Sequence, residues 1–175
     1  MKKIVPFFIL ITLCPFFIYG QDKEYVKEVD TFVVVSGKAF NNCDSSVFDN
    51  EQFLPVSPDG GGQLTIYKCK DDSRIMVEWI GLSYGHRIRT FYCKGGKLIY
   101  VTEVHFEFTW NASKNEYDRT HTQKIYSAAY YIKKDFYEYA EMTYEPKSRY
   151  HVESPEPITY VAKLIKTSKE YLAKP

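Results

Sequence analysis

The chain has 175 residues, with 23 lysines and arginines against 22 aspartates and glutamates, a net charge of +1. This balance gives no long-range field that would attract nucleic acid or an anionic membrane, so the composition argues against both as partners. The length suits one ordinary domain with a sizeable hydrophobic core.

The first 20 residues predict a secretory signal peptide. Lys2 and Lys3 precede an almost wholly apolar run over 4–19, and Gly20 places a small residue at its exit. A membrane-spanning helix would need about 20 apolar residues, and two prolines would interrupt this one. We therefore expect cleavage after Gly20 and a periplasmic or secreted protein with no membrane span. Loss of two lysines would leave 21 basic and 22 acidic residues.

Residues 21–62 predict an N-terminal helix followed by an irregular segment. Apolar residues in KEYVKEVDTFVVVS (23–36) recur at helical spacing, whereas the β-branched run TFVVV suits a strand. We favour a short helix that leads into an extended piece. From 36 to 62 the chain is rich in Gly, Asn, Asp, Ser and Pro, which is typical of an irregular connection.

From 63 to 144, short β-rich runs alternate with turn residues and predict an antiparallel meander of about six strands. Three similar segments, IYKCKDDSRIMV, FYCKGGKLIYV and YYIKKDFYEYA, each place a polar tip between two apolar strand ends. Glycine supplies the positive φ that tight hairpin turns need, and aspartate tolerates it. The repeated pattern therefore indicates successive hairpins of one sheet and not a reacting site.

The run 98–110 predicts the longest strand, in which alternate side chains point to opposite faces. We expect the first set to be buried and the far end of the second set to be solvated. The first set is Leu98, Tyr100, Thr102, Val104, Phe106, Phe108 and Trp110, and the second includes Glu103, His105 and Glu107. A strand of this length reaches about 40 Å, so we expect a bend or a bulge.

The C-terminal segment, 145–175, predicts a linker and an amphipathic helix over about 157–173. Pro157 suits the first turn of a helix, where its missing amide costs nothing. One apolar stripe would pack on the sheet, formed by Ile158, Val161, Leu164, Ile165, Tyr171 and Leu172. The predicted fold class is α+β, with 21–175 as one domain.

Three cysteines follow the signal: Cys43, Cys69 and Cys93. Cys69 and Cys93 end the first and third predicted strands, so the strand between them would separate them by nearly 10 Å. That distance is too long for a disulfide. We expect either a bridge from Cys43 to one of the other two cysteines or three free thiols, and no catalytic cysteine, since no base is placed beside one.

Glu103, His105 and Glu107 share one face of the long strand, which invites a metal site. Successive members lie about 6.6 Å apart, too far to bind one zinc ion without help from another strand. His121 could supply that help. The alternative is a wet sheet face whose charges pair across strands. We predict no metal and no cofactor, and we keep the three residues as candidate binding residues.

Aromatic residues are the most unusual feature, with 16 tyrosines and 12 phenylalanines in the chain. In the last predicted hairpin Tyr131 is out of phase with the tyrosines before it, and Tyr137 and Tyr139 are out of phase with Phe136. Some of these rings must face outward. They suit either sheet stability or a surface that binds a glycan or a protein, because a ring offers large area at small entropy cost.

The runs PDGGGQLTIYKC, LSYG and FYCKGGKLIYVTEVHFEF resemble a family of small exported bacterial proteins with a Tyr-Phe-x-x-Gly-Lys-Leu-Ile-x-Val hairpin. The likeness covers residues 57 to 141, with YYIKKDFYEYA at the family's second aromatic hairpin. It departs at Gln63, Cys93 and Lys134, where the family has an acid, an aromatic residue and a turn residue. The resemblance implies export and this fold, and no chemistry. The Tyr-x-Cys strand of IYKCKDDSRIMV is also similar to the lysozyme-inhibitor barrels.

Two functions follow from these patterns. The first is an exported non-catalytic binding or structural module of the bacterial cell envelope, with an envelope glycan or protein as its partner. The alternative is a cell-wall-directed hydrolase or lysozyme-type inhibitor. No Gly-x-Ser-x-Gly motif is present, and the triple glycine at 60–62 precedes a strand instead of a phosphate-binding helix. We therefore predict no catalytic residues.

Overall fold

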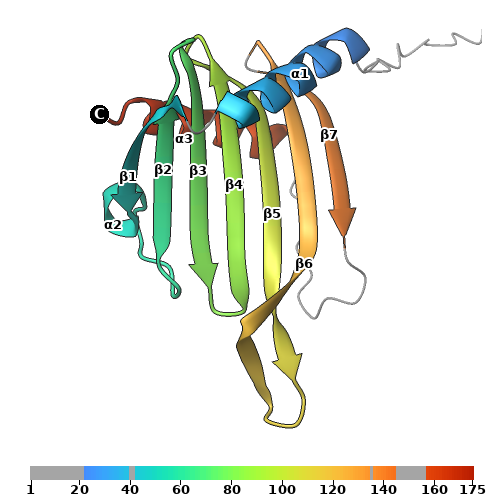
Figure 1. Cartoon of the computed structure of the whole chain (residues 1–175). Coiled ribbons are helices and arrows are strands. Elements are labelled where there is room, and N and C mark those ends of the chain that lie inside the picture. Colours follow the sequence, from blue (N-terminus) through green and yellow to red (C-terminus); the bar gives the residue numbers. More distant parts are fainter. Residues whose placement is uncertain (1–21, 40–41, 135, 145–156) are drawn as a thin grey trace, which may run out of the picture.

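The computed structural model describes residues 22–39, 42–134, 136–144 and 157–175. These residues form one antiparallel sheet with a long helix against each of its faces (Figure 1). The strands are β1 (Asp44–Asp49), β2 (Gly62–Lys68), β3 (Ser73–Leu82), β4 (Gly85–Lys94), β5 (Lys97–Asn111), β6 (Glu116–Lys133) and β7 (Phe136–Tyr144). The helices are α1 (Lys23–Ala39), the single turn α2 (Asn50–Phe53) and α3 (Pro157–Leu172).

The strands lie in the sheet in the order in which they occur in the chain, so the predicted α+β meander is confirmed. The structure adds β1, which lies in the segment predicted to be irregular and pairs with β2. Its sequence, DSSVFD, has little intrinsic preference for a strand. Pairing with β2 supplies the strand conformation that the local sequence does not.

Helix α1 is longer than predicted, and the expected extended piece TFVVV is helical. Asp22 begins the helix by accepting a hydrogen bond from the Tyr25 amide. Val29 is buried against Tyr100 and Tyr131 of the sheet. Burial of the α1 side chains that face the sheet outweighs the β-propensity of the valines, because tertiary contacts override local preference.

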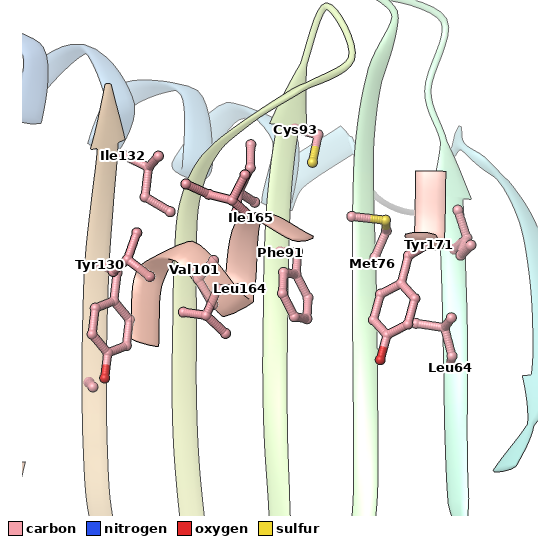
Figure 2. Close-up of a cluster of buried hydrophobic side chains, with 14 of the residues drawn as sticks. Leu64, Met76, Phe91, Cys93, Val101, Tyr130, Ile132, Leu164, Ile165 and Tyr171 are labelled. Carbon is pink, nitrogen blue, oxygen red and sulfur yellow. The ribbon is translucent and has the colours of Figure 1, made fainter. Parts of the chain in front are cut away.

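Helix α3 covers the opposite face of the sheet and forms the main core with it. Val161, Leu164, Ile165 and Tyr171 are buried, as predicted, whereas Ile158 is 69% exposed and that part of the predicted stripe is wrong. Figure 2 shows the helix lying across the strands. The row of sheet residues beneath it is Ile66, Met76, Phe91, Val101 and Tyr130.

The burial of β5 is the reverse of the prediction along its middle part. Glu103, His105 and Glu107 lie on the buried α3 side, while Val104 and Phe106 lie half-buried on the opposite side. The pattern of apolar residues misled the prediction, because both sets contain apolar members and the charged set finds compensating partners in the interior. The expected irregularity is confirmed by register shifts against β6 at His105/Phe106 and Phe108/Thr109.

The cysteines form one disulfide, between Cys43 and Cys69, with a Cα–Cα distance of 4.4 Å. The prediction that Cys69 and Cys93 are not joined is confirmed, and Cys93 is a buried free thiol. The bridge fastens the end of β2 to the residue that precedes β1. It therefore holds the edge strand of the sheet in place.

Gly60 and Gly81 allow the segment that precedes β2 to pass very close to the end of β3. The Gly81 amide donates to the Gly61 carbonyl, and a Cβ atom built on Gly81 would lie 2.4 Å from the Gly60 oxygen. Relief of such a contact requires a backbone shift. We expect Gly81→Ala to lower the free energy of unfolding by about 2 kcal/mol or more, measured by urea denaturation.

Gly37→Ala is the matched control, because it lies in α1 and a Cβ atom there has no heavy atom within 4 Å. This substitution should leave stability unchanged or raise it slightly, since alanine is the better helix former. Equal effects of the two substitutions would contradict the close approach at Gly81.

The disulfide closes a loop of 26 residues. Replacement of Cys43 and Cys69 by serine should lower the free energy of unfolding by about 3 kcal/mol, because the unfolded chain gains conformational entropy. Addition of a reductant should destabilise the wild type and leave the double variant unchanged. A wild type insensitive to reductant would show that the bridge does not form in solution.

Candidate functional site

Charged side chains meet in the interior between the sheet and α3, in what we call the buried charge cluster. Its members are Glu78, Arg87, Arg89, Glu103 and His105, together with the hydroxyl groups of Tyr160 and Tyr171. Strand pairing places Glu78, Arg89 and Glu103 directly opposite one another on β3, β4 and β5. An acid, a base and an acid thus form one row across the sheet.

Arg89 is the centre of the cluster. Its Nε donates to Glu103 Oε2 at 2.7 Å, and a terminal nitrogen lies 3.4 Å from Glu78 Oε1. Arg87 donates to the same Glu78 oxygen at 2.9 Å. Both carboxylates are therefore neutralised inside the protein, which burial of a charge requires.

Two tyrosines of α3 complete the cluster from above. The Tyr160 hydroxyl donates to Glu103, and Arg89 donates to that hydroxyl. The Tyr171 hydroxyl donates to Glu78 Oε2 at 2.5 Å. Each carboxylate of the row is thus bonded to α3 as well as to Arg89, so the cluster fixes the helix to the sheet.

His105 extends the cluster along β5. Its Nε2 lies 2.6 Å from Glu103 Oε1, and its ring packs edge-on against Tyr126 at 5.2 Å. Glu107, only 1% exposed, accepts a hydrogen bond from Gln123 at 3.4 Å. The predicted group Glu103, His105 and Glu107 is therefore interior, and the alternative of a wet sheet face is wrong.

His121 does not join these residues. It lies in β6, exposed, where its Nδ1 is 2.9 Å from Asp118 Oδ2. Over the part of the chain that the structure describes, no three His, Cys, Asp or Glu side chains come together to hold a metal ion.

The pKa values show what the cluster can do. Burial alone would raise the pKa of Glu103, but the hydrogen bond with His105 and the charge of Arg89 lower it to about 2. Burial also raises the pKa of Tyr160 and of Tyr171 above the ordinary value. At neutral pH the carboxylate of Glu103 is therefore ionised and the two phenols are protonated, which is the state in which the phenols donate to the acids.

The predicted tyrosines lie on the α1 side and at the last strand. Tyr131 is 6% exposed, and its hydroxyl donates to Asp30 of α1 at 2.8 Å, so it is not an outward-facing ring. Tyr137 and Tyr139 lie in β7 opposite Ile132 and Tyr131. The side chains of Tyr137 and Tyr139 lie outside the described residues, and their part in binding stays a prediction.

The α1 side of the sheet offers a different kind of site. Helix α1 crosses only the upper end of this side, and no other described helix lies over the strands below it (Figure 1). Two rows of side chains and an aromatic pair form this surface, which we call the open face. The rows are Val47, Thr65, Val77, Thr90, Thr102 and Ala129, and then Gln63, Trp79, Ile88, Val104, Ser127 and Thr143; the pair is His86 and Phe106. By strand register the first row continues to Glu141 of β7 and the second to Asp49 of β1.

The row members on β1 to β6, together with Thr143 and the pair, are half-buried or exposed, whereas most of the residues that alternate with them on β2 to β6 are buried on the α3 side. Trp79, in the lower part of the open face, is 36% exposed. The Trp79 ring lies 6.1 Å from that of His86, which stacks on Phe106 at 4.7 Å. Burial lowers the pKa of His86, which keeps this ring neutral at neutral pH.

A shallow hollow of about 270 Å³ opens between β5, β6 and β7 on the open face. Thr102, Val104, Ser127 and Thr143 line it. The Ser127 and Thr143 hydroxyls lie 2.5 Å apart. The open face therefore combines an aromatic group, formed by Trp79, His86 and Phe106, with a second region that carries hydroxyl groups.

The sequence prediction missed the open face because it assigned Val104 and Phe106 to the core. One signal could have found it. Glu78, Arg89 and Glu103 alternate in charge on three successive strands. Side chains that neutralise one another in this way can be buried, so their face can be the interior one. The residues that alternate with them would then face outward.

No helix of the described residues has both the length and the apolar composition that a membrane span requires. Comparison of the chain with protein-family models, with curated proteins and with solved structures finds no match.

The buried charge cluster predicts a specific pH dependence. Since the pKa of Glu103 falls from its ordinary value near 4.5 to about 2, its ionisation stabilises the fold above pH 4.5. This stability is lost as the pH falls toward 2. Glu103→Gln should remove it, so the wild type should lose about 2 kcal/mol more than the variant between pH 6 and pH 3.

Urea unfolding at the two pH values measures this difference. Glu116→Gln is the control, because Glu116 is exposed at the start of β6, on the projecting hairpin that the end of β5 and the start of β6 form below the rest of the sheet (Figure 1). It should show the pH dependence of the wild type. Parallel losses in the wild type and Glu103→Gln would show that Glu103 is not held in the cluster.

Proposed function

We propose that this protein is an exported, non-catalytic binding module of the bacterial cell envelope that holds its ligand on the open face. The observation that carries the proposal is this wide sheet surface, which α1 covers only at its upper end and which presents Trp79, Ile88 and Phe106 half-buried or exposed. Apolar residues left at a surface in one contiguous group mark interaction sites more often than isolated ones do.

The buried charge cluster supports the non-catalytic part of the proposal. A hydrolase would need an acid or base that a substrate can reach, yet Glu103 is 4% exposed and bonded to three partners. No observation favours the alternative of a cell-wall hydrolase or a lysozyme-type inhibitor.

The disulfide supports an oxidising location outside the cytoplasm, because such bridges are rare where thiols are kept reduced. The predicted signal peptide, which lies outside the described residues, supports a periplasmic or secreted protein. The resemblance to small exported bacterial proteins agrees with this location.

The two tryptophans allow a direct test. Trp79 lies on the open face, and Trp110 packs against Tyr117 on the projecting hairpin. In the Trp110→Phe variant the tryptophan fluorescence therefore comes from Trp79 alone. We expect a solubilised extract of bacterial envelopes to protect Trp79 from acrylamide quenching, because a bound ligand covers the ring.

Trp79→Phe is the matched control, since its fluorescence reports on Trp110. The same extract should leave quenching of Trp110 unchanged. If Trp79 stays equally accessible in the folded Trp110→Phe protein with and without extract, the open face does not bind an envelope component.

A further inference from the structure

We infer that the open face binds an uncharged oligosaccharide, with one sugar ring stacked on Trp79 and its hydroxyl groups bonded to the threonines of the neighbouring row. This inference rests on the proposed function and names the ligand class for the same site.

The aromatic part of the face suits a sugar ring. Trp79, His86 and Phe106 follow one another at centroid distances of 6.1 and 4.7 Å, and the last two rings are nearly parallel at 18°. Contact with its neighbours restricts the Trp79 ring, so little entropy is lost when a ligand packs on it. One side of a pyranose ring presents C–H groups, and an exposed indole is a large apolar surface on which they can pack.

The hydroxyl part of the face suits the rim of the same ligand. Thr65, Thr90 and Thr102 lie on β2, β4 and β5 in one row, with Val77 between the first two. A hydroxyl group both donates and accepts, as the hydroxyl groups of a sugar do. Neighbouring strands lie about 4.8 Å apart. The threonines therefore present hydroxyl groups at intervals along the row, where several hydroxyl groups of one oligosaccharide can bond to them.

The charges of the face argue against an anionic ligand. The rows contain no lysine or arginine, their charged members by register are the acids Glu141, opposite Ala129, and Asp49, opposite Gln63, and His86 is neutral at neutral pH. Arg87 and Arg89, which belong to the same strands, are paired with Glu78 and Glu103 on the opposite side. A phosphate, a nucleic acid or an anionic lipid would meet the acids Glu141 and Asp49 at the ends of the rows, while Lys124 lies at the margin, opposite Phe106.

The mixed composition also argues against a second copy of the chain as the occupant. Interfaces between identical subunits are mostly apolar at their centre. Here Thr90 and Thr102 lie beside Ile88 and Val104 in the middle of the face, so polar hydroxyl groups interrupt its apolar part.

Trp110→Phe protein provides the assay, with the emission of Trp79 as the readout. The probes are the neutral tetrasaccharides of glucose and of N-acetylglucosamine, with a tetrasaccharide of galacturonic acid as the anionic comparison. We expect a saturable change with at least one neutral probe, independent of salt, and none with the anionic one.

Hydroxyl removal tests the second half of the site. Thr90→Val and Thr102→Val should each weaken binding of the neutral probe roughly threefold or more, because one hydrogen bond is lost. Thr31→Val is the control, since Thr31 is exposed on α1 and bonds only to its own helix at Lys27. This control should bind as the parent does.

The outcomes separate the inference from the proposed function. Protection of Trp79 by the envelope extract with no response to either neutral probe overturns the inference and leaves the binding module intact. Binding that needs the anionic probe or disappears in salt overturns it too, as does protection that rises only with protein concentration, which would identify a second copy. If neither the extract nor any probe protects Trp79, both the inference and the proposed function are wrong.

Discussion

The whole structure depends on one row of buried charges, in which Arg89 lies between Glu78 and Glu103 on three neighbouring strands. Uncompensated carboxylates in this position would cost several kcal/mol each. Arg89 balances both, and the hydroxyl groups of Tyr160 and Tyr171 occupy further acceptor positions. Because these tyrosines belong to α3, the charges that would otherwise oppose burial determine where the helix lies.

The position of α3 decides the role of each face. One face of the sheet is closed by the helix, the apolar row around Phe91 and Val101, and the buried charge cluster. The other is covered by α1 at its upper end, around Val29, Tyr100 and Tyr131. The remainder of that face carries the exposed ring of Trp79. The buried charge cluster therefore holds α3 on one face, and the proposal of a binding site rests on the accessible part of the other face.

Much of the fold could be predicted from the sequence, because the turn residues and the C-terminal stripe carry local signals. Gly95 and Gly96 adopt positive φ at a predicted hairpin tip. The phase of β5 could not be predicted, since apolar residues occur on both of its faces and only the partners of Glu103 show which one is interior. Helix α1 extended through TFVVV for a related reason: contacts made across the sheet, and not local propensity, decide its conformation. The candidate site was missed as a consequence of the phase error.

The assignment of the two faces can be measured by chemical labelling of carboxylates in the native protein with a carbodiimide and an amine. The account predicts that Glu78 and Glu103 stay unmodified while Glu116, exposed on the hairpin of the same sheet, reacts fully. All three should react once the protein is unfolded in urea. Modification of Glu103 in the folded protein at the rate of Glu116 would contradict the account, because the acidic residues would then lie on an accessible face.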